Sequence, residues 1–387
     1  MSLDFNRRVT GLQEKMAEEG LDIVVYGSCQ NFQYLTGLLI DWRSGIDFES
    51  PANNVFVARE GSPILTLDEV FSEQSQKTTI KDVRVLKREG DYGKLVSTVL
   101  SDLDIKTNRV GLGDHVWGST VAELSKYAKG ASFHRAESLM DNLRMIKDPG
   151  EIDRLRKVAN LTDKVMENLL PKVKRGVTQG ELQLETEFLG RQLGATHVSF
   201  PFLAGFVKSG SEKLPPGYYT NACTYPKEKG LEPGTSVAFD FGFVMDGYCS
   251  DYGRSFYFGS ANEDAEKGYG ALHQGLIETV EKMHDGSMRV CDVYPTYEKT
   301  MDRLGYGDTL RARLTTQEVG HNIGVECHEL PWLNPSYKES LHANMVLALE
   351  PKIWRAGEYY LRVEDMVLVG SRKTEFLTNF DRKLFQL

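Results

Sequence analysis

The spacing of apolar residues near the start of the chain predicts alternating helices and strands. Residues 5–19 carry apolar side chains at Val9, Leu12 and Met16, which is the spacing of an amphipathic helix. The segment LDIVVYG that follows predicts a short buried strand, and we interpret the next segment, NFQYLTG (31–37), as a strand or a turn.

The same alternation continues over the next hundred residues. Short runs rich in β-branched and aromatic residues predict further strands at FVARE, SPILTL, VRVL, RVGLG and ASFHRAE. Helical spacing predicts helices at 94–103 and 119–129. Strands that alternate with helices indicate an α/β domain with a mixed or parallel sheet.

A strong helix start marks the end of this domain. Asp148, Pro149 and Glu151 supply an N-cap, a proline at the first helical position and a capping-box acid. Thr178 and Glu181 repeat the capping box, so a second helix is expected to about residue 193. Two antiparallel helices of this kind would cover one face of a sheet. We therefore expect an N-terminal domain at 1–146 and a C-terminal α+β domain at 147–387.

Two later stretches each predict a β-hairpin with a pair of inward acids. In VAFDFGFVMDGYCSDYGRSF (237–256) the turn signal Asp246-Gly247 separates two apolar strands, and folding there places Asp240 opposite a position near 251 to 253. Asp240 and Asp251 then share one face of the sheet. Two carboxylates this close repel each other unless a cation lies between them, so a bound metal is the favoured interpretation.

The second hairpin lies near the end of the chain. Glu350 and Glu364 are equally distant from a turn near Gly357 and can oppose each other across two strands. The segment GHNIGVECHE between the hairpins adds His321 and His328, with glycines that permit close backbone approach. Four carboxylates and one imidazole form a set of ligands suited to a catalytic pair of divalent ions.

Composition and charge narrow the class of protein. The chain has 387 residues, 41% of them hydrophobic, which is enough for two ordinary cores. Its net charge is −9 without a Lys/Arg-rich run, which argues against nucleic acid or an anionic membrane as a partner. No signal peptide or long apolar run is evident, and the five scattered cysteines contain no C-x-x-C pair, so we expect a cytoplasmic protein with reduced thiols.

These motifs resemble the pita-bread metallopeptidases, in particular the branch of aminopeptidase P, prolidase and creatinase. The ligand order of that family is Asp, Asp, His, Glu, Glu, and Asp240, Asp251, His321, Glu350 and Glu364 follow it one by one. The YLTG segment at 34–37 and the linker pattern R-x-I-K-x-x-x-E-I at 144–152 also resemble that branch. The resemblance implies a creatinase-like N-terminal domain and a pita-bread catalytic domain.

The resemblance also implies a function and residue roles. It implies a dinuclear exopeptidase that cleaves Xaa-Pro bonds of small peptides with a metal-bridged hydroxide, as an aminopeptidase or a dipeptidase. The expected cofactor is two divalent ions, with Mn²⁺ preferred and Co²⁺, Zn²⁺ or Fe²⁺ as alternatives. His328 would hold the scissile carbonyl, Glu350 would transfer the proton, and Arg362 would orient Glu364 and contact substrate. Relatives are often homodimers, so a homodimer is expected.

Two departures from the family pattern leave an alternative open. Cys223 stands where the family has a substrate-side histidine, and Gln317 stands where aminopeptidase P has another. A thiol is a poor substitute for an imidazole as a hydrogen-bond donor. A gap in the loop could instead bring His197 near the site. The alternative is a non-peptidase enzyme on the same fold, a creatinase-like hydrolase or a lyase that acts on a small metabolite. A binding protein with a dead site is disfavoured because all five ligands are present.

Overall fold

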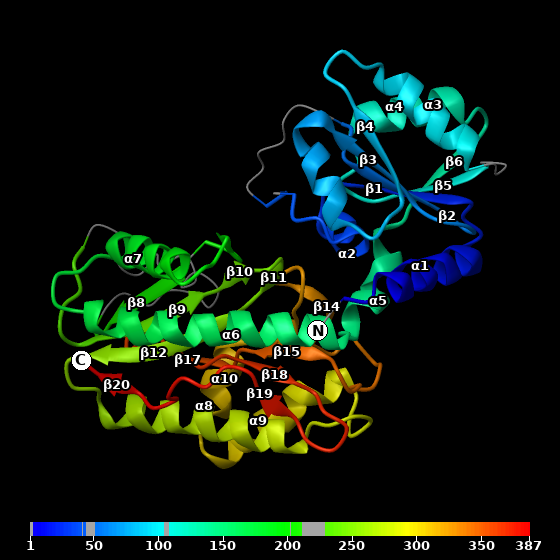
Figure 1. Ribbon diagram of the computed structural model, residues 1–387. Coiled ribbons are helices and arrows are strands. Elements are labelled where there is room, and N and C mark those ends of the chain that lie inside the picture. The colour runs from blue at the N-terminus through cyan, green and yellow to red at the C-terminus, as the bar shows by residue number, and fades with distance from the viewer. Residues whose placement is uncertain (1–2, 41, 44–50, 104–107, 202, 211–228) are drawn as a thin grey trace. The chain divides into compact units, whose positions relative to one another are not determined.

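The computed structural model describes residues 3–40, 42–43, 51–103, 108–201, 203–210 and 229–387 (Figure 1). The chain divides into two compact units between Arg144 and Met145. Among the described residues, no helix combines the length and apolar character that crossing a bilayer requires.

The N-terminal unit is built around one six-stranded mixed sheet with the strand order β4-β3-β2-β1-β5-β6. Strand β1 pairs antiparallel with β2 and parallel with β5, as the α/β pattern predicts. Its strands are β1 (Ile23–Gly27), β2 (Asn54–Ala58), β3 (Ile64–Asp68), β4 (Asp82–Leu86), β5 (Arg109–Leu112) and β6 (Ser132–Arg135). Its helices are α1 (Phe5–Glu19), α2 (Gln30–Thr36), α3 (Tyr92–Asp102), α4 (Gly118–Tyr127) and α5 (Asp141–Met145), with 3₁₀ helices at Glu69–Lys77 and Glu137–Met140.

The interpretation of residues 31–37 as a strand or a turn is wrong, because the structure places them in helix α2 and its cap. Gly37 ends the helix in the left-handed conformation (φ 75°), where glycine costs least. The Arg8 guanidinium donates a hydrogen bond to the Tyr34 carbonyl and stacks 3.9 Å from the centre of its ring. Every residue of α2 is buried, so tertiary packing decides a conformation that the local pattern left open.

The C-terminal unit layers helices on both sides of its strands (Figure 1). Its helices are α6 (Pro149–Leu169), α7 (Gln179–Gln192), α8 (Glu263–Lys282), α9 (Val293–Arg303) and α10 (Gly307–Arg313), with 3₁₀ helices at Leu170–Lys172 and Val290–Asp292. Both predicted capping boxes are present, at Asp148 with Glu151 and at Thr178 with Glu181. The apolar side of α6 packs against β9 and β12 through Val158, Leu161, Phe239 and other buried residues.

The strands of this unit form several small sheets. One sheet has the order β20-β12-β9-β8 and another the order β14-β13-β15-β18-β19, while β11-β10-β7 and β16-β17 form smaller ones. The strands are β7 (His197–Val198), β8 (Leu203–Lys208), β9 (Thr235–Phe241), β10 (Phe243–Met245), β11 (Tyr248–Cys249), β12 (Tyr252–Phe258), β13 (Gly320–Asn322), β14 (Glu329–Trp332), β15 (Val346–Leu349), β16 (Lys352–Arg355), β17 (Tyr359–Arg362), β18 (Asp365–Leu368), β19 (Glu375–Phe376) and β20 (Phe385–Gln386).

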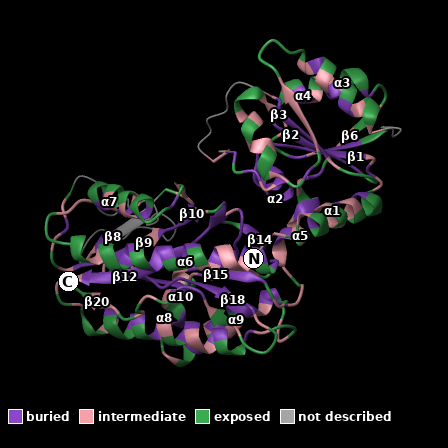
Figure 2. Cartoon of the chain, viewed as in Figure 1, coloured by how far each residue is buried: buried purple, intermediate pink, exposed green. Residues whose placement is uncertain are grey.

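The strands carry the buried surface of this unit. Figure 2 shows buried residues along β12, β15 and β18, whereas the helices expose their outer sides. Helices α8 and α9 cover the strands on the side away from α6, with Leu272, Leu276 and Tyr297 in one core with Leu347 and Leu361. Charged side chains on these strands are therefore enclosed between two apolar layers.

Candidate metal centre

The first predicted hairpin is confirmed. Asp246 and Gly247 both have positive φ (50° and 80°) in the turn between β10 and β11, as expected of a type I′ hairpin. The register continues into β9 and β12, where Asp240 lies directly opposite Gly253. Asp251 precedes the first residue of β12. The two acids therefore approach each other across adjacent strands, as their spacing predicts.

The second hairpin is also confirmed. Leu349 pairs with Asp365 in the β15–β18 ladder, and Lys352 pairs with Arg362 in the β16–β17 ladder. The two ladders share one register, so Glu350 lies opposite Glu364.

A close contact at Gly253 joins the two hairpins. The Glu364 backbone N–H donates to the Gly253 carbonyl at 2.8 Å, and the two residues form an isolated antiparallel bridge. A Cβ atom on Gly253 would lie 2.5 Å from Arg362 Nε and 2.9 Å from Glu364 Oε2. Sequence reasoning did not single out Gly253, although only a residue without a side chain fits here.

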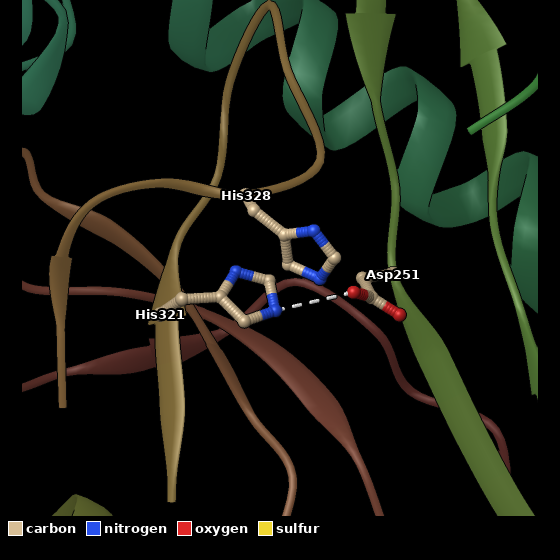
Figure 3. Close-up of side chains that lie close together, drawn as sticks. All are labelled: Asp251, His321 and His328. Carbon is tan, nitrogen blue, oxygen red and sulfur yellow. Dashed lines mark ion pairs between the residues drawn. The ribbon is translucent and has the colours of Figure 1, made fainter. Parts of the chain in front are cut away.

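His321 reaches the same place from β13. It pairs with Ala348 in β15, and a Cβ on the preceding Gly320 would lie only 2.0 Å from the Ala348 carbonyl oxygen. His321 Nδ1 lies 3.1 Å from the Asn322 carbonyl oxygen, to which it would donate its proton. The other ring nitrogen, Nε2, faces Asp251 Oδ2 at 3.3 Å (Figure 3). The hydrogen bond from Nδ1 to the Asn322 carbonyl fixes the tautomer in which Nε2 can bind a metal ion.

The possible ligands fall into two overlapping groups. Ligand atoms of Asp240, Asp251 and Glu364 lie within 4.8 Å of one another, and so do those of Asp251, His321 and His328. Asp251 belongs to both groups. Glu350 is in neither group. Its carboxylate contacts the Lys352 ammonium and lies 3.1 Å from an Arg362 nitrogen.

Arg362 is the cation at the centre of the carboxylates. Its guanidinium contacts Asp240 and Glu364, in addition to Glu350, and its side chain is 3% exposed. Burial and the charge of Arg362 act in opposite directions on the pKa values of the acids around it. Burial raises the pKa of Asp240 to about 6, even though the charge of Arg362 opposes the shift. Burial also holds the pKa of Glu364 well above its usual range, with Arg362 again opposing.

The pKa of Asp251 is shifted in the opposite direction. Burial alone would raise the pKa of Asp251, but its close contact with His321 and the positive charge of Arg362 outweigh burial and lower it to about 2. The pKa of Glu350 is also lowered, because the charges of Lys352 and Arg362 outweigh burial. Neighbouring carboxylates with such different pKa values are typical of functional sites.

Three buried polar atoms in the centre fit a bound cation. Asp251 Oδ1, Glu364 Oε1 and His321 Nε2 are shielded from solvent and have no hydrogen-bond partner among the described residues. Leaving such atoms unpaired costs roughly 1–3 kcal/mol each, and more where they carry charge. Oxygen ligands with one imidazole nitrogen suit a hard or borderline divalent ion. The residues that the structure brings together therefore fit the expected type of metal.

His328 lies at the solvent side of the centre. Its side chain is exposed and its ring centroid is 4.5 Å from that of His321. The Trp332 indole stacks on His328 with ring centroids 5.1 Å apart. Trp332 belongs to β14, and sequence reasoning missed it because only the β13–β14 pairing brings it to His321.

Two further side chains support the ligands from behind. The Cys327 thiol lies 3.1 Å from Asp251 Oδ2 and would donate a hydrogen bond to it. Glu329, which follows His328, forms a buried ion pair at 3.0 Å with Lys147 near the start of α6. The sequence showed Lys147 and Glu329 only as parts of separate motifs. Their contact ties the histidine segment to the residues before α6.

The structure describes one of the two residues that depart from the family pattern. Cys223 is outside the described residues. Gln317 has a positive φ of 55° in the turn before β13. His197 belongs to β7 and pairs with Val244 in β10, and neither of the two ligand groups of the described residues contains it.

Comparison with known proteins extends this description to both units. The family profile "Metallopeptidase family M24" matches residues 153–371, and the profile "Creatinase/Prolidase N-terminal domain" matches residues 8–146. The fold and the carboxylate–histidine centre are those of a two-domain metallohydrolase. The chain belongs to metallopeptidase family M24. The resemblance drawn from the ligand order and the linker is thus confirmed.

Individual relatives agree with this assignment. The putative dipeptidase YkvY of Bacillus subtilis (strain 168) is 29% identical over 296 residues, 76% of this chain and 77% of that protein. The structure of an Xaa-Pro dipeptidase from Bacillus anthracis matches with a TM-score of 0.83 and 23% identity, covering 99% of this chain and 100% of the other. A prolidase from Thermococcus sibiricus matches with a TM-score of 0.83 and 24% identity over 100% of both chains. At these identities the structural matches establish the fold.

Proposed function

We propose that this chain is a dinuclear metal-dependent exopeptidase that cleaves Xaa-Pro bonds. Asp240, Asp251, His321, Glu350 and Glu364 would hold the two divalent ions. The observation that carries the proposal is that Asp251 Oδ1, Glu364 Oε1 and His321 Nε2, buried atoms of the two overlapping ligand groups, have no hydrogen-bond partner among the described residues. Mn²⁺ is the expected ion, since oxygen donors dominate the set.

The side chains of this centre have distinct tasks in peptide hydrolysis. When bound, the ions supply a nucleophile at neutral pH and a Lewis acid for the scissile carbonyl. His328, exposed and stacked on Trp332, would donate a hydrogen bond to the carbonyl oxygen as negative charge develops there. Glu350, whose side chain is 15% exposed, would accept a proton and deliver it to the leaving amine.

Arg362 would hold the ligands in place. Its contacts with Asp240, Glu350 and Glu364 fix three carboxylates with one planar group. A guanidinium suits this task because its donors have a rigid geometry and it stays protonated when buried. Its position, almost fully enclosed, favours orienting the ligands over contacting substrate.

The Xaa-Pro preference is supported by the relatives. Solved structures of the same fold are named Xaa-Pro dipeptidase and prolidase, and a curated relative is named a putative dipeptidase. The metal-dependent part of the proposal is supported by the pairing of Asp240 and of Glu364 with Gly253, which brings two of the expected ligands to β12.

An assay panel on protein reconstituted with Mn²⁺ tests the proposal. The panel contains Xaa-Pro dipeptides, longer Xaa-Pro peptides, dipeptides without proline and creatine-like amidines. We expect hydrolysis of the Xaa-Pro bond that is lost on chelation and restored by metal. Turnover of the amidine alone would replace the proposal with a creatinase-like activity. An absence of turnover in a protein with full metal content would also contradict it.

A further inference from the structure

A second cation, Lys352, lies in the centre beside Arg362. The two residues are directly opposite each other in the β16–β17 ladder, so their side chains share one face of the sheet. The Lys352 ammonium contacts Glu350. Its charge also acts on Asp240 and His328, so it lies within electrostatic range of both.

The exposure of the side chains divides the centre into a floor and a mouth. Asp251, His321 and Glu364 are 5%, 0% and 0% exposed and form the floor. Asp240, Glu350 and Lys352 are 16%, 15% and 11% exposed and, with the exposed His328, form the mouth. The Lys352 ammonium therefore lies among the more exposed side chains of the centre.

The ammonium retains capacity for a ligand. An ammonium has three donors, and Glu350 is the one hydrogen-bond or ion-pair partner of Lys352 among the described residues. The four carboxylates of the centre balance two divalent ions. Lys352 and Arg362 then add positive charge that these acids do not compensate. Arg313, at the end of α10, adds a further positive charge near Glu350.

We infer that Lys352 is a specificity-determining residue that binds a carboxylate of the substrate beside the scissile bond. In an Xaa-Pro dipeptide this carboxylate is the C-terminal one on the proline, which a longer peptide lacks at that position. The inference rests on the proposed function and deepens it, because it assigns the chain a dipeptidase preference. A residue that only neutralised Glu350 would instead affect all substrates equally.

The test compares each Xaa-Pro dipeptide with its C-terminal amide, which lacks the negative charge. The wild type should favour the free acid by at least about tenfold in kcat/KM. In Lys352→Met, the ratio of kcat/KM for acid over amide should fall by about 10–100-fold, mainly through KM, because a charge-assisted hydrogen bond is lost. Lys352→Arg should keep most of the preference.

A matched control and a binding measurement separate this inference from the proposed function. Lys267→Met removes an exposed lysine of α8, 65% exposed, and should leave the ratio as in the wild type. Titration calorimetry of proline and of prolinamide into the Mn²⁺-loaded protein reports recognition without turnover. Tighter binding of proline that Lys352→Met abolishes supports the subsite even if no Xaa-Pro bond is cleaved. An unchanged acid-to-amide ratio in Lys352→Met, or equal binding of proline and prolinamide by the wild type, would overturn the inference.

Discussion

Replacing Asp240 with asparagine should stabilise the metal-free protein and destabilise the metal-loaded one. Burial raises the pKa of Asp240 from 3.8 to about 6 in the folded chain, so the fold disfavours its ionised form. This rise corresponds to about 3 kcal/mol of destabilisation once the carboxyl is ionised. Asparagine keeps the shape of the side chain without the charge and removes that penalty.

The pH dependence follows from the direction of the shift. Between about pH 4 and 6 the folded chain binds more protons at Asp240 than the unfolded chain, so the stability of the wild type falls as pH rises. The advantage of Asp240→Asn should therefore be absent below about pH 4, grow to about pH 6 and stay constant above it. For a domain of this size, about 3 kcal/mol corresponds to a rise in Tm of roughly 6–12 °C.

Thermal unfolding in a chelator and with Mn²⁺ measures both effects. A ligand at 1,000 times its Kd stabilises a protein by about 4.1 kcal/mol, which exceeds the penalty of about 3 kcal/mol, and the variant lacks one carboxylate for the ion. The order of Tm should therefore invert when Mn²⁺ is added at pH 8. If the chelated wild type is as stable as Asp240→Asn at pH 8, the buried carboxylates are not held in conflict and the reasoning fails.

Two other substitutions test how the centre is supported. Cys327→Ala should weaken metal affinity by about 10–100-fold in a chelator competition, as expected for loss of a group that orients a ligand. Cys327→Ser keeps a donor to Asp251 and should stay near wild type, and the remote Cys291→Ala serves as control. Equal loss of affinity in Cys327→Ala and Cys327→Ser would contradict the orienting role. Gly253→Ala should lower the free energy of unfolding by about 1–3 kcal/mol through overpacking against Arg362. Gly270→Ala in α8 is the control and should leave stability unchanged, because a Cβ there meets nothing within 4 Å. An unaffected Tm in Gly253→Ala would contradict the close approach of the hairpins.

The sequence predicted those parts of the centre that depend on local signals. Asp246-Gly247 and Gly357 are turn signals, and equal spacing about each turn specifies which acids oppose each other. The helices α6 and α7 begin at capping boxes that a few neighbouring residues define. Helix α8 has comparable signals, an Asn262 cap and acidic residues in its first turn, but no prediction was made from them.

The features that sequence reasoning missed depend on contacts between distant segments. Gly253 matters because Glu364 pairs with it, and no local pattern at either residue indicates that pairing. Trp332 reaches His321 only through the pairing of β13 with β14. Lys352 is a different case, because it follows Glu350 by two residues and pairs with Arg362 about the same Gly357 turn, so the predicted hairpin already implied its place.

The content of divalent metal per chain tests the central claim most directly. We expect protein reconstituted with Mn²⁺ and freed of excess ion to hold about two ions per chain by elemental analysis, and Asp251→Ala to hold fewer while it remains folded by circular dichroism. Full metal content in folded Asp251→Ala, or no bound metal in the wild type, would contradict the assignment of these side chains as the ligands.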